Sequence, residues 1–175
     1  MGIAIDKQGN AWVANAGNNT IAELNSSGII ITTYTVNNYP FAVAIDPSGN
    51  LWVTNGFLNS VTELSSAGVL ITTVTGFSNP GSIAIDSAGD VWVTNGMGNT
   101  ITELNPGGTT INIYTTQANI YPFGMAIDAS GNVWVANYGS NTVTEIFGIA
   151  HGPQYFPYTG PQFPGGGNIS FLFFG

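Results

Sequence analysis

Cationic side chains are nearly absent from this chain of 175 residues, which has one lysine (Lys7), no arginine and nine acids, for a net charge of −8. Nucleic-acid binding depends on Lys and Arg that neutralise phosphates, so DNA and RNA are excluded as partners. Cysteine is absent as well. This absence removes disulfide frameworks, thiolate zinc sites and thiol catalysis.

Long apolar runs are missing too, since no stretch of about 18 apolar residues occurs. The start, MGIAIDKQGN, has neither the basic region nor the apolar region of an export signal. We therefore expect no membrane span, and an extracellular or cell-surface protein whose signal has been removed or lies upstream. With 43% hydrophobic and 6% charged residues, the chain is expected to fold.

A fourfold repeat with a period near 40 residues organises what is present. In its first unit, GIAID, AWVAN, TIAEL and IIITTYT are rich in β-branched and aromatic residues, and turn-like KQGN, AGNN and NSSG separate them. This predicts an all-β chain, a β-propeller-type repeat with four blades of four antiparallel strands. The blades are expected at about 2–38, 39–78, 79–119 and 120–147. The repeated acids and tryptophans are Asp6, Asp46, Asp86 and Asp128; Trp12, Trp52, Trp92 and Trp134; and Glu23, Glu63, Glu103 and Glu145.

The repeated pattern carries a family resemblance. GIAID..GN.WV.N...N.I.EL, which covers residues 2–146, resembles the NHL-repeat propellers and their relatives of the virginiamycin B lyase type. The resemblance implies the propeller fold, whose members serve as binding platforms, scaffolds or enzymes. Such propellers commonly have six blades, whereas this chain has four. The lyase relatives are understood to use more than one histidine and an acid near the central axis, whereas this chain has only His151.

Two repeated positions could hold a metal or a turn. Each repeated Asp precedes a Gly-containing turn, where its carboxylate can accept backbone N–H groups; calcium is the alternative, because carboxylates and amide carbonyls are ligands of hard cations. The Asn that ends each second strand could hold a metal at the channel mouth, as in lactonase-like propellers, or a hydrogen-bonded turn. We favour the turns and expect no cofactor, with Ca²⁺ as the alternative. These weak metal candidates are Asp6, Asp46, Asp86, Asp128, Asn15, Asn55, Asn95 and Asn137.

The repeated Glu is expected to face the repeated Trp. Antiparallel pairing of the second and third strands places Trp12 opposite Glu23, and the same arithmetic applies in the other blades. Because the chain has almost no cations, we expect each Glu to accept from an indole N–H or a hydroxyl, or to lie in water. Metal binding is the less favoured alternative.

The ionisable residues argue against a catalytic site. Eight of the nine acids lie at repeated positions, which leaves Lys7, Asp90 and His151 unrepeated. Acid–base and nucleophilic catalysis need a positioned pair of groups, and a lone histidine supplies one of them. We therefore expect a non-enzymatic structural or interaction module without catalytic residues. The alternative is an enzyme of the propeller lyase or metal-dependent lactonase/hydrolase type, acting at the channel mouth.

Positions at which the repeats differ mark a candidate binding face. The loops after the second strands read AGNN, GFLN, GMGN and YGSN, and the segments that lead into the blades read NNYPF, FSNPG and IYPFG. Both sets lie on one face of a propeller. Aromatic and apolar side chains that the turns do not require indicate a protein or glycan ligand. The candidates are Tyr39, Phe41, Phe57, Leu58, Met97, Tyr121, Phe123 and Tyr138.

The end of the chain departs from the repeat. Residues 148–175 form an arm rich in Pro, Gly and aromatics, with an apolar strand predicted at 169–174. This strand either folds back as the outer strand of blade four or adds to the sheet of another molecule. With bare blade edges, the arm indicates a homo-oligomer or a filament. The association residues are Tyr155, Phe156, Tyr158, Phe163, Ile169, Phe171, Leu172, Phe173 and Phe174.

Overall fold

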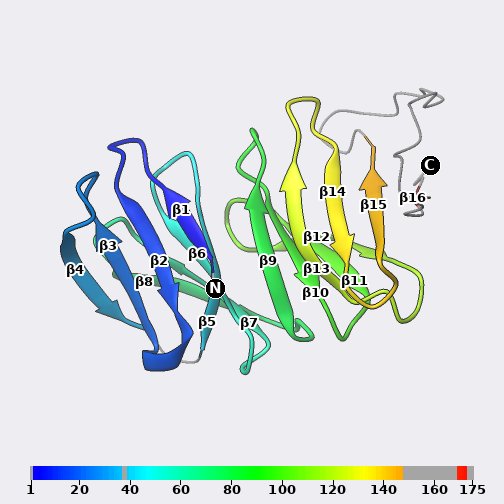
Figure 1. Ribbon diagram of the computed structural model, residues 1–175, viewed down its shortest axis with the longest axis horizontal. Helices are drawn as coiled ribbons and strands as arrows, with labels where there is room; N and C mark the ends of the chain where they lie inside the picture. The colour runs from blue at the N-terminus through cyan, green and yellow to red at the C-terminus, as the bar shows by residue number, and fades with distance from the viewer. Residues whose placement is uncertain (1, 37–38, 148–168, 173–175) are drawn as a thin grey trace.

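Four sheets of four strands make up the computed structural model, which describes residues 2–36, 39–147 and 169–172 (Figure 1). In every sheet the strands lie side by side in chain order. The all-β propeller-type fold predicted from the period is confirmed. No helix in these ranges is long and apolar enough to cross a membrane.

The bounds of the strands repeat from blade to blade. Blade one contains β1 (Ile3–Ile5), β2 (Ala11–Asn15), the short 3-10 helix η1 (Ala16–Asn18), β3 (Thr20–Leu24) and β4 (Ile30–Thr35). Blade two contains β5 (Pro40–Ile45), β6 (Leu51–Asn55), β7 (Ser60–Leu64) and β8 (Leu70–Thr75). Blade three contains β9 (Pro80–Ile85), β10 (Val91–Asn95), β11 (Thr100–Leu104) and β12 (Thr110–Thr115). Blade four contains β13 (Pro122–Ile127), β14 (Val133–Asn137), β15 (Thr142–Ile146) and β16 (Ile169–Leu172).

The outer strand of blade four differs from the other three. β16 pairs with β15 in parallel, with Val143 opposite Ile169 and Ile146 opposite Leu172, whereas β4, β8 and β12 pair antiparallel with their neighbours. Of the two fates expected for the terminal strand, the structure shows the return to its own sheet. His151 and the other association residues of the arm lie outside the described residues. These association residues are Tyr155, Phe156, Tyr158, Phe163, Phe173 and Phe174.

The blades pack face to face, and each contact has the same composition. One side of the contact is the Trp face of a blade, which in blade one includes Trp12, Ala14 and Ile21. The other side is the aliphatic face of the next blade, which in blade two includes Val43 and Val53. Blades two and three, and blades three and four, repeat this arrangement. Apolar residues on both surfaces of a strand are therefore buried between neighbouring sheets.

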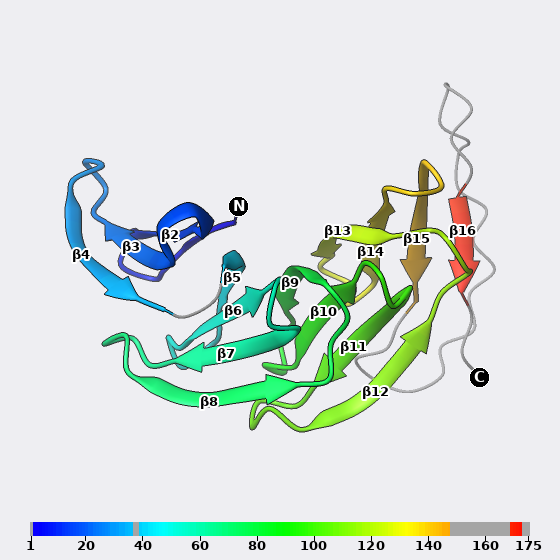
Figure 2. The ribbon, with the colours of Figure 1, turned by 90° about the horizontal axis from the view of Figure 1, so that it is seen from below.

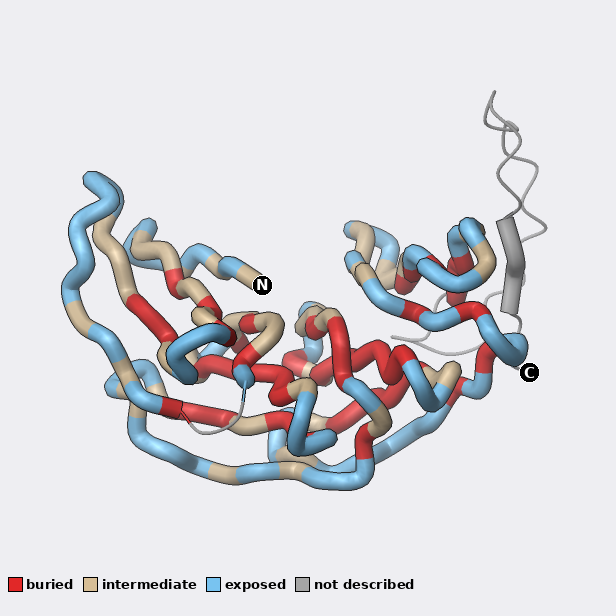
Figure 3. Tube along the Cα trace, turned by 60° about the horizontal axis from the view of Figure 1, so that its bottom comes forward, coloured by how far each residue is buried: buried red, intermediate tan, exposed pale blue. Residues whose placement is uncertain are grey.

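The four blades form an open arc. Contacts join β5 to β1 and β2, β9 to β5 and β6, and β13 to β9 and β10, so neighbouring blades touch through their inner strands. Figure 2 shows blade one and blade four at the two ends of the arc, with the inner strands on its concave side. Burial is most continuous in the middle of the arc (Figure 3). Ring closure, which the sequence left open, is not reached by this chain alone.

Candidate functional site

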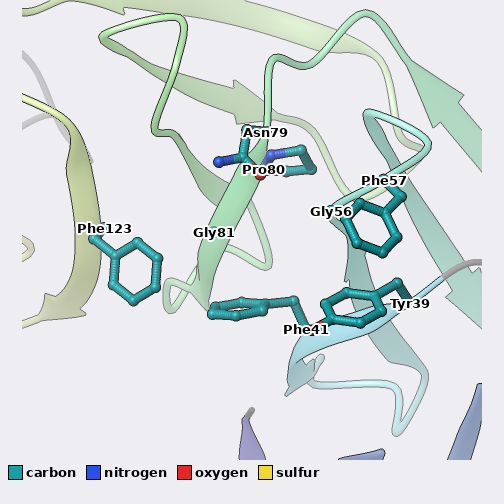
Figure 4. A pocket seen from close by; sticks show the side chains of 8 residues that line it. All are labelled: Tyr39, Phe41, Gly56, Phe57, Asn79, Pro80, Gly81 and Phe123. Atoms are coloured by element: carbon teal, nitrogen blue, oxygen red, sulfur yellow. The ribbon is translucent and has the colours of Figure 1, made fainter. Parts of the chain in front are cut away.

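An aromatic pocket lies where the inner strands of blades two, three and four begin. Its volume is about 150 Å³, and Figure 4 shows the side chains that line it. Asn79 and the Tyr39 hydroxyl are the polar side-chain groups of the lining, and no carboxylate takes part. The lining residues are Tyr39, Phe41, Gly56, Phe57, Asn79, Pro80, Gly81 and Phe123.

Ring contacts connect the part of this lining in blade two with the part in blade four. Tyr39 and Phe57 of blade two have ring centroids 4.3 Å apart. Phe41 of blade two meets Phe123 of blade four edge to face at 5.4 Å, although blade three lies between them. Such edge-to-face pairs are a favoured aromatic geometry.

Gly81 makes the contact across blade three achievable. Phe41, Gly81 and Phe123 each follow the proline that begins an inner strand. A Cβ at Gly81 would lie 3.1 Å from the Thr94 Oγ1 and 3.3 Å from the Phe123 carbonyl oxygen. The missing side chain therefore lets the Thr94 hydroxyl and the backbone of Phe123 lie this close to β9, between the two phenylalanines (Figure 4). Sequence reasoning missed Gly81, because its contribution is an absence of atoms.

Two buried threonines fix the position of the pocket strands. The Thr54 hydroxyl accepts the Ala42 N–H at 3.0 Å and donates to the Gly81 carbonyl of the next blade at 2.8 Å. Thr94 repeats this bridge, accepting from Ser82 at 2.9 Å and donating to Phe123 at 3.0 Å. Each bridge lies where the inner strand shifts register, so the hydroxyl satisfies an N–H that the sheet ladder leaves unpaired.

Repeated asparagines in the loops hold the segments that lead into the next blade. Asn19, Asn59 and Asn99 adopt left-handed φ values of 56°, 51° and 50°, which Asn tolerates. Their side-chain oxygens accept backbone N–H groups from Tyr39, Asn79 and Tyr121 at 2.8, 2.7 and 3.1 Å. The shared spacing of these asparagines was the available signal, and it was not interpreted at the sequence level.

The other candidates of the binding face are divided. Tyr138 contacts Phe123 with ring centroids 6.5 Å apart, which extends the aromatic surface beyond the pocket. Leu58 and Met97 are exposed and do not line it. Tyr121 lies beside Gly139, where an added Cβ would come within 2.8 Å of its ring. Five of the eight candidates are thus brought together: Tyr39, Phe41, Phe57, Phe123 and Tyr138.

The repeated Asp residues hold the turns after the inner strands. Asp6 accepts the N–H groups of Gln8 and Asn10 with Oδ1 and the Trp12 indole N–H with Oδ2, at 2.9, 2.8 and 3.0 Å. The indole bond recurs at Asp46, Asp86 and Asp128. Burial acts to raise the pKa of Asp6, but the bonds from Trp12 and the turn outweigh it and lower that pKa.

The repeated Asn residues at the ends of the second strands bind within their own sheets. The Asn55 amide donates to Ser60 at 3.2 Å and to Thr62 at 2.8 Å, and Asn95 and Asn137 make the equivalent bonds in blades three and four. Asn15 has one such bond, to Thr20 at 3.4 Å. These contacts tie the second strand of each blade to the third.

The metal candidates occupy opposite ends of the blades. Each Asp follows the end of an inner strand, whereas each Asn ends the second strand, beside the start of the inner strand. A strand of five or six residues separates these ends by roughly 17–20 Å, so Asp and Asn cannot bind one ion together. In the described ranges no group of three or more His, Cys, Asp or Glu residues could hold a metal ion.

The repeated Glu residues face Trp across the strands, as the pairing arithmetic predicted. Of the three environments expected for the Glu side chains, the bond from the indole N–H does not occur, because the indole donates to the Asp at the strand end. Glu23 and Glu63 instead accept amide N–H groups from Asn10 and Asn50, each at 2.9 Å. In blade four, Glu145 is buried with an unpartnered Oε2, and burial, followed by the charge of Asp128, raises its pKa.

The repeated Glu of blade three has other hydrogen-bond donors, because Asp90 stands where the other blades have Asn10, Asn50 and Asn132. Glu103 accepts from the Asn112 amide at 2.7 Å and from the Tyr114 hydroxyl at 2.8 Å, which agrees with the predicted hydroxyl donor. Burial and the bond to Glu103 raise the pKa of Tyr114. Burial, followed by the charges of Asp86 and Glu103, raises the pKa of Asp90.

Asp90→Asn is expected to stabilise the protein at neutral pH. A raised pKa means that the folded protein favours protonated Asp90 and that ionised Asp90 opposes folding. The stability that protonated Asp90 contributes is fully present below the ordinary pKa of 3.8. It is lost as the pH rises through the pKa of Asp90 in the folded state. The amide removes the charge and can donate to Glu103. We expect a gain of about 1 kcal/mol in unfolding free energy, measured by urea denaturation at pH 7.

The gain should shrink as the pH falls toward 3.8. Asn50→Asp is the matched control, because it places the same carboxylate beside Asp46 and Glu63 in blade two and should destabilise. If the Asp90→Asn variant is only as stable as the parent at pH 7, ionised Asp90 does not destabilise the folded protein and the prediction is wrong.

Solved structures with the same fold are mostly much longer than this chain. A streptogramin B lyase structure is 24% identical with a TM-score of 0.76, over 83% of this chain and 50% of that one. A catalytically inactive variant of virginiamycin B lyase from Staphylococcus aureus with quinupristin is 22% identical with a TM-score of 0.73, over 85% and 55%. A gluconolactonase from Xanthomonas campestris is 14% identical with a TM-score of 0.70, over 82% and 56%. This chain thus spans about half their length. No family model and no curated protein matches the sequence.

These comparisons correct the expectation of a non-enzymatic module. The similar structures are lyases and a gluconolactonase, which favours the enzymatic alternative. The expectation rested on the acids and the single histidine of this chain. A chain that spans half the length of such enzymes need not supply the whole catalytic set, so that inventory did not exclude an enzyme.

Proposed function

We propose that this chain belongs to a propeller enzyme of the lyase type and supplies the wall that binds an apolar part of the substrate at the channel mouth. The aromatic pocket is the observation that carries this proposal. Tyr39, Phe41, Phe57 and Phe123 come from two blades and meet over Gly81. Small-molecule sites are concave, mostly apolar and supplied with a few polar groups, as this pocket is.

The chemistry of the lining supports a lyase over a metal-dependent hydrolase. Hard cations bind carboxylate and carbonyl oxygens, and the carboxylates of the repeated Asp residues lie at the far end of the blades. Phe41 and Phe123 offer ring surfaces, which suit apolar or aromatic groups of a ligand. The pocket therefore orients the substrate.

Quinupristin, which accompanies one of the similar enzymes, is the probe for this proposal. We expect saturable binding to the 175-residue chain by isothermal titration calorimetry. Phe41→Ala and Phe123→Ala should each weaken binding about tenfold, since each loses roughly 1.4 kcal/mol of ring contact. Met97→Ala is the matched control, because Met97 is an exposed apolar side chain of the same face outside the pocket.

Absence of binding, or equal binding by all three variants, would refute the pocket as the substrate wall. The type of reaction is read from product mass in any sample that turns the probe over. Elimination by a lyase leaves the combined mass of the products equal to that of the substrate, whereas hydrolysis adds one water.

A further inference from the structure

The rings of the aromatic pocket present negative charge density to its interior. An aromatic ring is partially negative on its two faces and partially positive at its edge. In Figure 4 the Phe41 ring lies between those of Phe123 and Tyr39 and is seen nearly edge-on. One of its faces is therefore turned toward Asn79 and Gly81, which also line the pocket. A group held against that face meets the negative part of the ring.

The side-chain amide of Asn79 adds a partial negative charge to this lining. A Cβ added at Gly56 would lie 3.8 Å from the Asn79 Oδ1, and a Cβ added at Gly96 would lie 3.6 Å from the Asn79 Nδ2. Gly56 lines the pocket, whereas Gly96 does not. The oxygen of the amide is therefore the end that lies beside the lining. The backbone N–H of Asn79 is already used, since it donates to the Asn59 side chain at 2.7 Å.

No lysine or arginine lies in the lining to satisfy these negative groups. Lys7, the single lysine of the chain, donates to the Pro47 carbonyl at 2.7 Å. Both residues belong to the turns that follow the inner strands, whereas the pocket lies where the inner strands begin. The chain as a whole has a net charge of −8, which attracts cations toward its surface. The pocket is thus suited to a positive charge that a ligand brings.

We propose that the aromatic pocket binds a methylated ammonium group of a small organic ligand. A trimethylammonium group presents only methyl carbons to its surroundings and carries a positive charge, so several aromatic rings recognise it through cation–π attraction. The pocket volume of about 150 Å³ is that of an apolar cavity that holds benzene, which is comparable in size to this group. The proposal rests on the proposed function, because it names the substrate group that the same site takes.

A neutral apolar group is the competing occupant of the pocket. It would gain the same burial of apolar surface. It would gain nothing from the ring faces or from the net charge of the chain, because both act on a positive charge. Two ligands of the same shape that differ only in charge therefore separate the two occupants.

Choline and 3,3-dimethylbutan-1-ol are such a pair, since a positively charged nitrogen in the first replaces a carbon in the second. We expect choline to bind the 175-residue chain roughly five to ten times more tightly than the neutral alcohol. NMR titrations of the ¹⁵N-labelled protein at low ionic strength measure both affinities. Equal affinities, tighter binding of the alcohol or no binding of choline would overturn the proposal.

Phe41→Leu tests whether the ring itself recognises the charge. Leucine keeps an apolar side chain in the pocket and leaves the net charge unchanged. We expect choline to bind about fivefold more weakly and the alcohol to change less than about twofold. Far-UV circular dichroism establishes that the variant is folded, and the comparison of the two ligands on the unaltered chain needs no variant.

Tyr121→Asn is the matched control. Tyr121 is 44% exposed and does not line the pocket, and its φ of 46° is one that Asn tolerates. The substitution should leave both affinities unchanged. If Phe41→Leu keeps the preference for choline, or Tyr121→Asn removes it, the pocket does not recognise the ammonium group.

Quinupristin distinguishes a failure of this proposal from a failure of the proposed function. If quinupristin binds and choline does not, the substrate wall stands and the preference for ammonium is wrong. If choline binds and quinupristin does not, the ammonium site stands and the proposed lyase substrate wall is wrong. If neither binds, both proposals are wrong.

Discussion

Trp92→Ala is expected to lower the free energy of unfolding by about 3–5 kcal/mol, the usual cost of truncating a large buried aromatic residue. Trp92 is 1% exposed and stacks on Tyr114 with ring centroids 5.4 Å apart. It also packs against Val133 and Val135 of blade four, and its indole donates to Asp86 at 3.1 Å. The substitution opens a cavity between blades three and four and removes a donor from a carboxylate. Urea denaturation followed by circular dichroism measures the loss.

Trp134→Ala is the matched control for this prediction. Trp134 keeps the same bond, to Asp128 at 3.0 Å, but it is only half-buried, because no described blade packs on its face. We expect a clearly smaller loss than for Trp92→Ala. Equal losses would show that packing between blades contributes little.

Gly68→Ala is expected to cost about 2–5 kcal/mol, the sum of left-handed backbone strain and overpacking. Gly68 has a φ of +71°, and an added Cβ would overlap the ring of Tyr34 in blade one. That ring stacks on Trp12 at 5.7 Å, so it cannot move away without losing the stack. Thermal and urea unfolding measure the effect.

Gly28→Ala separates the backbone cost from the packing cost. Gly28 occupies the same turn position in blade one, with a φ of +76° and nothing within 4 Å of an added Cβ. We expect a loss of about 1 kcal/mol from strain alone. If the two substitutions cost the same, the contact between Gly68 and Tyr34 is not a tight one.

The sequence predicted the elements of the fold because each blade is specified locally. A run such as LWVTN carries its strand propensity within five residues, and the loop length fixes the register of Trp52 against Glu63. The sequence did not predict which group accepts the hydrogen bond of the Trp indole. Cross-strand pairing states which Cβ atoms are neighbours, whereas the Trp52 indole reaches beyond its pair to Asp46 at 3.4 Å.

The candidate site was predicted in part. Aromatic departures from the repeat identified Tyr39, Phe41, Phe57 and Phe123, because a turn does not require such side chains. That Phe41 and Phe123 meet could not be predicted, since they lie in blades two and four and their contact depends on Gly81. The openness of the arc depends on the angle between neighbouring sheets, which strand patterns do not encode.

The order of the strands also bears on how the molecule folds. Every sheet joins strands that are neighbours along the chain, and each blade touches the blades next to it, so the arc behaves as a one-dimensional array. Folding can then nucleate in a single blade and propagate by nearest-neighbour contacts. β16 differs from the other outer strands, because many more residues separate it along the chain from its partner β15. Loop closure of this length costs entropy, which makes the edge of blade four the last part of the array to form.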